Sequence, residues 1–241
     1  MTSESLTLAT TAFVLGAVHT ALGPDHYLPF VALARARAWT LRRAVAVALA
    51  CGAAHVGSSA LLGLVGFVGG RTVAELVAFD TARGPIAGWM LFGLGLAYAV
   101  WGLRRAVKGH RHDHLHVHAD GTVHRHPHDH HGDHAHLHAD SRGATTPAAW
   151  GLFLFFVFGP CEPLIPLFIY PAASGGSPLE VVAVLAAFSV ATLGTMVVLV
   201  TIGYQAAGRL ARHSPMALAR WSHVLAGATL AVCGLLINAG L

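Results

Sequence analysis

The chain has 241 residues, of which 55% are hydrophobic and only 11% are charged, and its mean hydropathy is +0.60. A soluble domain carries roughly 25% charged residues, so this composition excludes a soluble globular protein and indicates an integral membrane protein. The sequence pI of about 9.3 follows from basic residues gathered on one side of a membrane, and it does not require nucleic acid as a partner.

Apolar stretches long enough to cross a bilayer occur six times along the chain. About 20 mostly apolar residues span the hydrocarbon core. The stretches cover residues 6–34, 44–69, 85–103, 148–171, 179–204 and 217–240. We therefore predict an all-α integral membrane protein with six transmembrane helices. The first stretch has no basic segment before it and is longer than the apolar core of a secretory signal, so we expect it to remain in the mature protein.

Basic residues lie almost entirely on one side of the predicted helices. Thirteen of the fifteen Lys and Arg residues follow the first, third and fifth helices, and only Arg71 and Arg83 fall on the other side. Because Lys and Arg collect in cytoplasmic loops, we place both termini outside the cytoplasm and the long loop between helices three and four inside. The expected location is the cell membrane.

The first helix contains a polar interruption, "HTALGPDH", at residues 19–26. Pro24 removes a backbone donor and Gly23 permits unwinding, so the helix is expected to break there. His19 and His26 are seven residues apart and can share one helix face, with Asp25 beside them. Since irregular backbone survives at membrane depth only where protein or a water-filled cavity satisfies it, the break points to a binding site.

Two further segments add polar groups at membrane depth. "CGAAHVGSS" in the second helix contributes His55, and "GPCEPLIP" in the fourth contributes Cys161 and Glu162. An acidic side chain at the bilayer centre costs roughly 2.5–3.5 kcal/mol, and imidazoles with carboxylates suit divalent transition metals. We therefore predict one metal site. Its candidate ligands are His19, Asp25, His26, His55, Glu162 and Cys161.

Simpler readings of the same residues stay open. His55 could form a hydrogen bond to a neighbouring helix. His26 with Asp25 could relay protons without a metal, and Cys161 could be a small buried hydrophobic residue.

The two halves of the chain resemble each other. "WMLFGLGLAYAVWGL" at 89–103 matches "WSHVLAGATLAVCGL" at 221–235 with an offset of 132, and "LGPDHYLPF" aligns with "FGPCEPLIP". Because each half has three helices, the second would be inverted in the membrane. We predict a 3+3 inverted repeat with helices one and four broken at Gly-Pro. The halves are residues 1–107 and 148–241, joined by a loop at 108–147.

The connecting loop is rich in histidine. Thirteen of the eighteen histidines lie within residues 110–138, in "HRHDHLHVHADGTVHRHPHDHHGDHAHLH". Such tracts are typical of metal binding, and with few apolar residues the segment is expected to be disordered without metal. A tethered chelator would raise the local metal concentration. A cationic or pH-responsive spacer is the alternative.

The spacing H-x5-D-H in "HTALGPDH" resembles the signature of nickel/cobalt permeases of the urease-accessory and hydrogenase-accessory types, in the LysE-like membrane superfamily. "AAHVGSS" is similar to their second-helix motif. The resemblance implies a secondary transporter for a divalent metal ion, nickel or cobalt first and zinc next, with His19, Asp25, His26 and His55 as ligands. It implies no prosthetic cofactor, no enzyme activity, and cytoplasmic metallochaperones as partners. The high-affinity uptake branch has H-x4-D-H, one residue shorter.

A rival interpretation starts from "GPCEPLIP", which resembles the Cys-Pro segment of transmembrane thiol carriers of the cytochrome-biogenesis type. Such proteins move reducing equivalents by thiol–disulfide exchange. They need two cysteines from corresponding positions of the halves, whereas Cys161 aligns with Asp25, and Cys51 is the only partner at a similar level; the third cysteine is Cys233. A membrane metal sensor is a third alternative.

Overall fold

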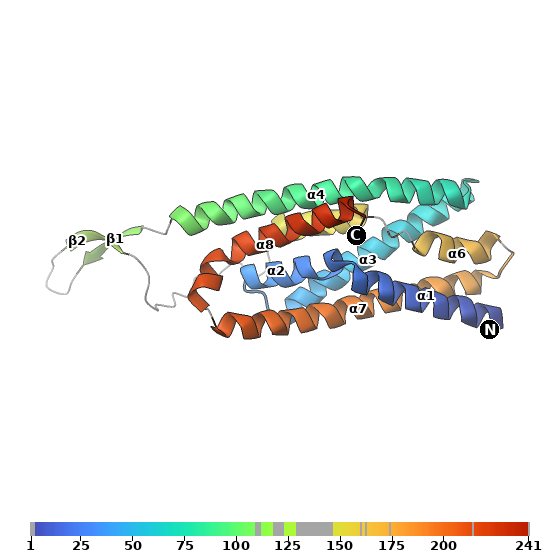
Figure 1. The fold of residues 1–241 in the computed structure, drawn as a ribbon, viewed down its shortest axis with the longest axis horizontal. Coiled ribbons are helices and arrows are strands. Elements are labelled where there is room, and N and C mark those ends of the chain that lie inside the picture. The colour runs from blue at the N-terminus through green and yellow to red at the C-terminus, as the bar shows by residue number, and fades with distance from the viewer. Residues whose placement is uncertain are drawn as a thin grey trace.

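The computed structural model describes residues 3–108, 112–117, 123–128, 147–159, 161, 163–173, 175–213 and 215–240. Most of these residues form helices that lie along one long axis (Figure 1). The elements are α1 (Ser3–Leu22), the 3₁₀ helix η1 (Pro24–His26), α2 (Leu28–Ala36), α3 (Leu41–Val68), α4 (Val73–Lys108), β1 (His112–Val117), β2 (Val123–His128), α5 (Pro147–Phe158), α6 (Leu164–Ala173), α7 (Pro178–His213) and α8 (Pro215–Asn238).

The helical part is an integral membrane protein by length and composition. Five helices of the described chain are long and apolar enough to cross a membrane, within α1, α3, α4, α7 and α8. The predicted fourth span, 148–171, is divided into α5 and α6, each too short to cross alone. Large apolar side chains such as Leu61, Val190 and Ile202 are exposed on the helices, as expected for surfaces that face lipid.

The first predicted helix is interrupted at Gly23. α1 ends at Leu22, where the Gly23 N–H still donates to the His19 carbonyl (3.0 Å). Pro24 begins η1, and the His26 N–H closes that turn on the Gly23 carbonyl (3.1 Å). The break therefore satisfies much of its own backbone.

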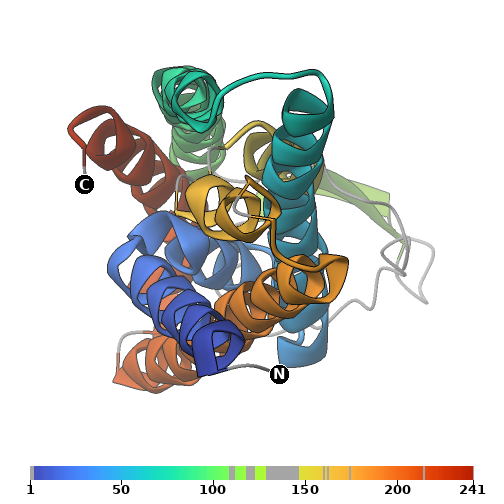
Figure 2. The ribbon, with the colours of Figure 1, turned by 90° about the vertical axis from the view of Figure 1, so that its right-hand side faces the viewer.

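The fourth predicted helix is interrupted between Phe158 and Leu164. The following piece, α6, lies at the centre of the bundle when it is viewed along the long axis (Figure 2), and it contacts α1, α3, α4 and α7. The second interruption is thus enclosed by protein, and Gly159 and Cys161 are both buried.

α4 begins earlier than the sequence analysis predicted, at Val73 instead of residue 85. Thr72 and Glu75 form a capping box: the Glu75 N–H donates to Thr72 Oγ1 (3.2 Å), and the Thr72 N–H donates to Glu75 Oε2 (2.9 Å). Pro85 lies inside the helix. Two charged residues left outside the predicted helices, Asp80 and Arg83, are therefore inside a membrane-spanning helix.

α4 and α8 run side by side in opposite directions (Figure 1). They approach most closely at glycines. A Cβ added to Gly95 would lie 2.7 Å from the Gly227 carbonyl oxygen, and one added to Gly227 would lie 2.6 Å from the Gly95 carbonyl oxygen. Only glycine fits at such a backbone contact, and the two glycines contact each other reciprocally.

The histidine-rich segment contains a two-stranded antiparallel hairpin, β1 and β2, beyond the end of α4 (Figure 1). Its register pairs His112 with His128, His114 with His126, and His116 with His124. Over these strands the segment is paired, and not unstructured as predicted, because histidine at every second position fits the two-residue period of a strand. The rest of residues 110–138 lies outside the described residues.

Candidate functional site

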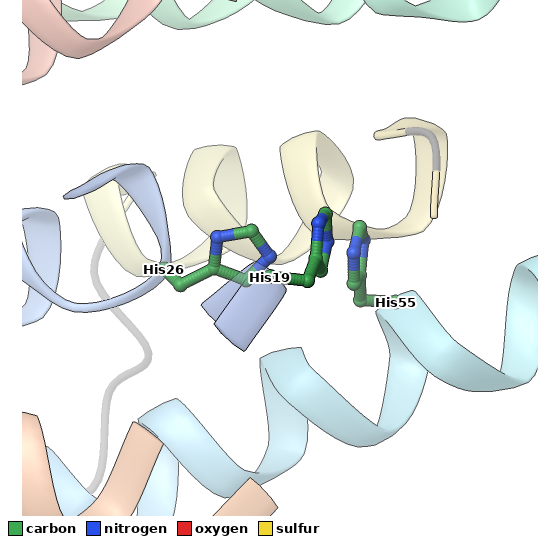
Figure 3. A group of neighbouring side chains, drawn as sticks. All are labelled: His19, His26 and His55. Atoms are coloured by element: carbon green, nitrogen blue, oxygen red, sulfur yellow. The ribbon is translucent and has the colours of Figure 1, made fainter. Parts of the chain in front are cut away.

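Three histidines from three elements meet inside the bundle. His19 stands in the last turn of α1, His26 ends η1, and His55 lies within α3. Their ring centroids are 4.9 Å apart for His19 and His26, 5.3 Å for His26 and His55, and 6.5 Å for His19 and His55. Figure 3 shows the rings of His19 and His55 parallel, with the His26 ring nearly perpendicular to both. We call this group the histidine cluster.

Neighbouring acceptors fix the tautomer of two rings. His55 Nδ1 lies 3.3 Å from the Phe156 carbonyl oxygen. His26 Nδ1 lies 3.2 Å from the Gly23 carbonyl oxygen and 3.2 Å from Asp25 Oδ1. Carbonyl and carboxylate oxygens only accept, so both Nδ1 atoms carry the hydrogen and each neutral ring presents a lone pair at Nε2.

The three Nε2 atoms are buried without a hydrogen-bond partner in His19, His26 and His55. His26 and His55 are only 3% and 4% exposed. An unsatisfied buried polar group costs about 1–3 kcal/mol, and here three of them occur together.

The cluster has the donor set of a metal site. Each ring offers one ligand nitrogen, and these nitrogens all lie within 4.8 Å of one another. Three nitrogens at the usual metal distance of 2.0–2.1 Å would be about 3.4 Å apart in a tetrahedral site, so small side-chain rotations would close the ligand set. Nδ1 donation to a carbonyl or a carboxylate is the usual outer contact of a metal-bound histidine.

The structure separates the six predicted ligands. His19, His26 and His55 come together, whereas Asp25 contacts His26 Nδ1 from outside the cluster. Cys161 is fully buried, but it is not part of the cluster. Glu162 lies outside the described residues.

The three cysteines are buried. Cys51 and Cys233 belong to one core cluster, whereas Cys161 belongs to another, where it packs with residues such as Leu76 and Phe188. Cys161 is the one that stands at a helix break, three residues before the first residue of α6.

Asp80 and Arg83 are site residues that the sequence analysis missed. Both contact the second break: the Cys161 N–H donates to Asp80, and Arg83 donates to the Val157 carbonyl. The capping pattern Thr72-x-x-Glu75 was the available signal, since it marks a helix start seven residues before Asp80.

One family model matches almost the whole chain. It is described as the cytochrome c biogenesis protein transmembrane region, and it matches residues 9–236. No curated protein and no solved structure matches the chain.

This match corrects the sequence analysis. The identification as a nickel/cobalt permease is wrong, and so is the assignment of nickel and cobalt transport, because the matched family is one of thiol–disulfide carriers. The H-x5-D-H signature covers few residues, whereas the family model covers the helices of both halves. The match supports the rival interpretation, a transmembrane electron carrier of the cytochrome-biogenesis type, better than a metal permease. The chain belongs to the family of the cytochrome c biogenesis protein transmembrane region.

Proposed function

We propose that this protein is a carrier, and not an enzyme, that moves reducing equivalents across a membrane by thiol–disulfide exchange, with Cys161 as the exchanging thiol. The family match supports this proposal. The observation that carries it is the position of Cys161, which is fully buried at the interruption between α5 and α6. Interrupted backbone at membrane depth is typical of the working centre of a membrane carrier.

The exchange needs a second thiol in the carrier. The Cys161 thiolate attacks a disulfide of the electron acceptor, which forms a mixed disulfide and releases one acceptor thiolate. The second carrier thiol then attacks the Cys161 sulfur, which releases the other acceptor thiolate and leaves a disulfide in the carrier. Two electrons pass to the acceptor, which takes up two protons. A donor dithiol on the opposite side restores the carrier by the reverse steps.

We assign the second thiol to Cys51. It lies on α3, which packs against α5 and α6. The two cysteines belong to different core clusters, and a disulfide requires Cα atoms within about 7 Å. We therefore propose that the segment of Cys161 moves against α3 during the cycle.

Reconstituted vesicles test this function. Reduced glutathione is added outside the vesicles, and the disulfide dithiobis(nitrobenzoate) is enclosed inside. Electrons that cross the membrane reduce this disulfide, and the release of thionitrobenzoate inside measures the transfer. Cys161→Ser and Cys51→Ser should abolish the protein-dependent release, whereas Cys233→Ser should retain it. Full release by a variant that lacks all three cysteines would refute thiol exchange.

A second proposal concerns the histidine cluster: it binds one divalent transition-metal ion through the three Nε2 atoms, with Asp25 orienting His26. The three unpartnered buried nitrogens support this proposal. Imidazole suits zinc, copper and iron, and a resident ion would tie α1 and η1 to α3. Glu162 stays a predicted fourth ligand.

Zinc is the probe for this site. A protein lacking residues 110–138 should bind one Zn²⁺ per chain, and X-ray absorption should show nitrogen scatterers from at least three imidazoles. The proposal would be refuted if no zinc binds, or if the coordination shell of the bound zinc contains no imidazole. The histidine-rich segment is proposed as a separate chelator, so its removal should lower the total zinc bound but leave this one ion.

We also infer a 3+3 inverted repeat with both termini outside the cytoplasm. The reciprocal contact of Gly95 and Gly227 supports the repeat, because these residues align at the offset of 132. Arg37, which follows α2, donates from Nε to Tyr98 Oη of α4 (2.9 Å). Arg220 of α8 donates from Nε to the Ala106 carbonyl of α4 (3.2 Å). Basic residues that follow α2 and begin α8 thus lie beside the second half of α4, as the positive-inside pattern predicts. The N-terminus lies at the opposite end (Figure 1). Reporter fusions at both termini should give extracytoplasmic signals.

A further inference from the structure

Asp80 and Arg83 form an ion pair within the membrane-spanning helix α4. Arg83 Nη1 donates to Asp80 Oδ1 at 2.8 Å. The Arg83 side chain is 16% exposed and the Asp80 side chain is 0% exposed. Ionised groups at this depth are expensive and usually have a function. Neither residue belongs to the histidine cluster.

Each partner makes a second contact, and both contacts reach the break before α6. Asp80 Oδ2 accepts the Cys161 N–H at 3.1 Å, and Arg83 Nη2 donates to the Val157 carbonyl oxygen at 2.8 Å. In a continuous α-helix, the N–H of residue 161 would donate to the carbonyl of residue 157. The ion pair thus replaces both halves of one missing helical hydrogen bond.

The backbone on either side of this step is regular. The Gly159 N–H donates to the Phe155 carbonyl (2.7 Å), and the Leu164 N–H donates to the Cys161 carbonyl (3.0 Å). Cys161 is therefore held through its N–H by α4 and through its carbonyl by the first turn of α6. Both contacts fix the backbone that orients the thiol.

We propose that Asp80 and Arg83 are positioning residues that hold the fourth predicted helix open and keep the Cys161 thiol in place for exchange. The inference rests on the proposed function of Cys161, but its geometry does not depend on electron transfer. The two hydrogen bonds to the break are the essential contacts, and the charges keep the two side chains together.

The test separates these hydrogen bonds from the charges. Cys51→Ser and Cys233→Ser leave Cys161 as the only thiol, and mass spectrometry measures its rate of alkylation by N-ethylmaleimide. The pair Asp80→Asn with Arg83→Gln keeps one acceptor and one donor without charge, so the rate should stay within about threefold of the parent. The pair Asp80→Ala with Arg83→Ala removes both, so water must satisfy the break, and the rate should rise at least about tenfold.

A control lies on the same helix. Arg71 and Glu75 form an exposed ion pair at 3.9 Å. Arg71→Ala removes this pair and keeps the Thr72–Glu75 capping box, so it should leave the alkylation rate unchanged. If the double Ala variant does not fold, a second variant takes its place.

Asp80→Asn with Arg83→Ala removes only the donor to the Val157 carbonyl, and its rate of Cys161 alkylation should exceed that of the Asn/Gln pair. The inference is overturned if the Ala-containing variant reacts no faster than the Asn/Gln pair.

The readout distinguishes this inference from the proposed function. If Cys161→Ser leaves electron transfer intact, thiol exchange is refuted, and the alkylation rates still decide the role of the ion pair. If Cys161→Ser abolishes transfer but the alkylation rates do not change, only the positioning role is refuted.

Discussion

The two helix breaks begin with the same Gly-Pro pair but are completed differently. At the first break, η1 follows at once, and the His26 N–H bonds to the Gly23 carbonyl (3.1 Å) within the same segment. At the second break, the Cys161 N–H and the Val157 carbonyl take their partners from α4. One break is satisfied locally, and the other is satisfied by a neighbouring helix.

This difference shows how one backbone pattern supports two kinds of chemistry. At the first break, the backbone hydrogen bonds are made within η1 itself, so the His26 Nε2 atom can lie beside those of His19 and His55. At the second break, α4 instead holds the backbone of Cys161, whose thiol we propose as the exchanging group. We therefore expect substitutions at the first break to affect metal binding, and substitutions at the second to affect stability and thiol chemistry.

The largest effect is expected from Asp80→Ala. The substitution leaves the Arg83 guanidinium buried without its carboxylate, and breaking one side of a buried pair destabilises a protein by about 3–5 kcal/mol. Denaturant unfolding in detergent micelles measures this loss. Arg71→Ala removes an exposed ion-pair partner but keeps the Thr72–Glu75 capping box, so it should have no measurable effect. Equal losses in both variants would show that the second break does not depend on α4.

The next largest effect is expected from His55→Ala, which should reduce zinc affinity by more than about 100-fold. Loss of a residue that only contacts a ligand lowers metal affinity about 10–100-fold, and loss of a ligand itself should lower it further. Calorimetric titration of the protein lacking residues 110–138 measures the affinity. His223→Ala is the matched control, since His223 Nδ1 contacts Tyr98 Oη (2.9 Å) away from the cluster. Unchanged affinity in His55→Ala would remove His55 from the site.

Asp25→Ala should lower zinc affinity by about 10–100-fold, because the carboxylate orients the His26 ring instead of binding the ion itself. X-ray absorption of the zinc-loaded variant should retain the same nitrogen shell. Loss of an oxygen scatterer from that shell would contradict this role and make Asp25 a direct ligand.

The smallest effect is expected at the glycines that begin the two breaks, Gly23 and Gly159. A Cβ on Gly23 would lie 2.5 Å from His26 Nδ1 and 2.9 Å from Asp25 Oδ1, whereas one on Gly159 would meet His55 Nδ1 only at 3.5 Å. Gly23→Ala should displace the His26 ring and weaken zinc binding about tenfold, since overpacking costs about 1–3 kcal/mol. Gly159→Ala should not change it measurably. The reverse order would contradict the assignment of the cluster to the first break.

Much of the helical architecture could be predicted from the sequence. Long apolar runs revealed the helices, and Gly-Pro pairs revealed where two of them stop. His19 and His26 could be brought together from their spacing, because two helical turns separate them. His55 was found because a polar side chain in an apolar run requires a partner, which the structure provides in the Phe156 carbonyl.

The remaining features depend on tertiary packing. Which way Asp25 points is decided by η1, so its place outside the histidine cluster was not visible in the spacing. Asp80 and Arg83 were left outside the predicted helices because the third apolar stretch begins at residue 85, although the Thr72–Glu75 capping box marks the start of the helix. The family was misassigned because a short histidine signature was weighted above the pattern of the whole chain, which residues 9–236 share with the matched family.

The reciprocal contact of Gly95 and Gly227 has an evolutionary consequence. On the inverted-repeat topology proposed here, each glycine meets the counterpart of itself. A surface that is complementary to its own upside-down copy needs no second surface to evolve before assembly can begin. An ancestral gene for a single three-helix unit, whose product entered the membrane in both senses, would already have encoded both sides of this interface.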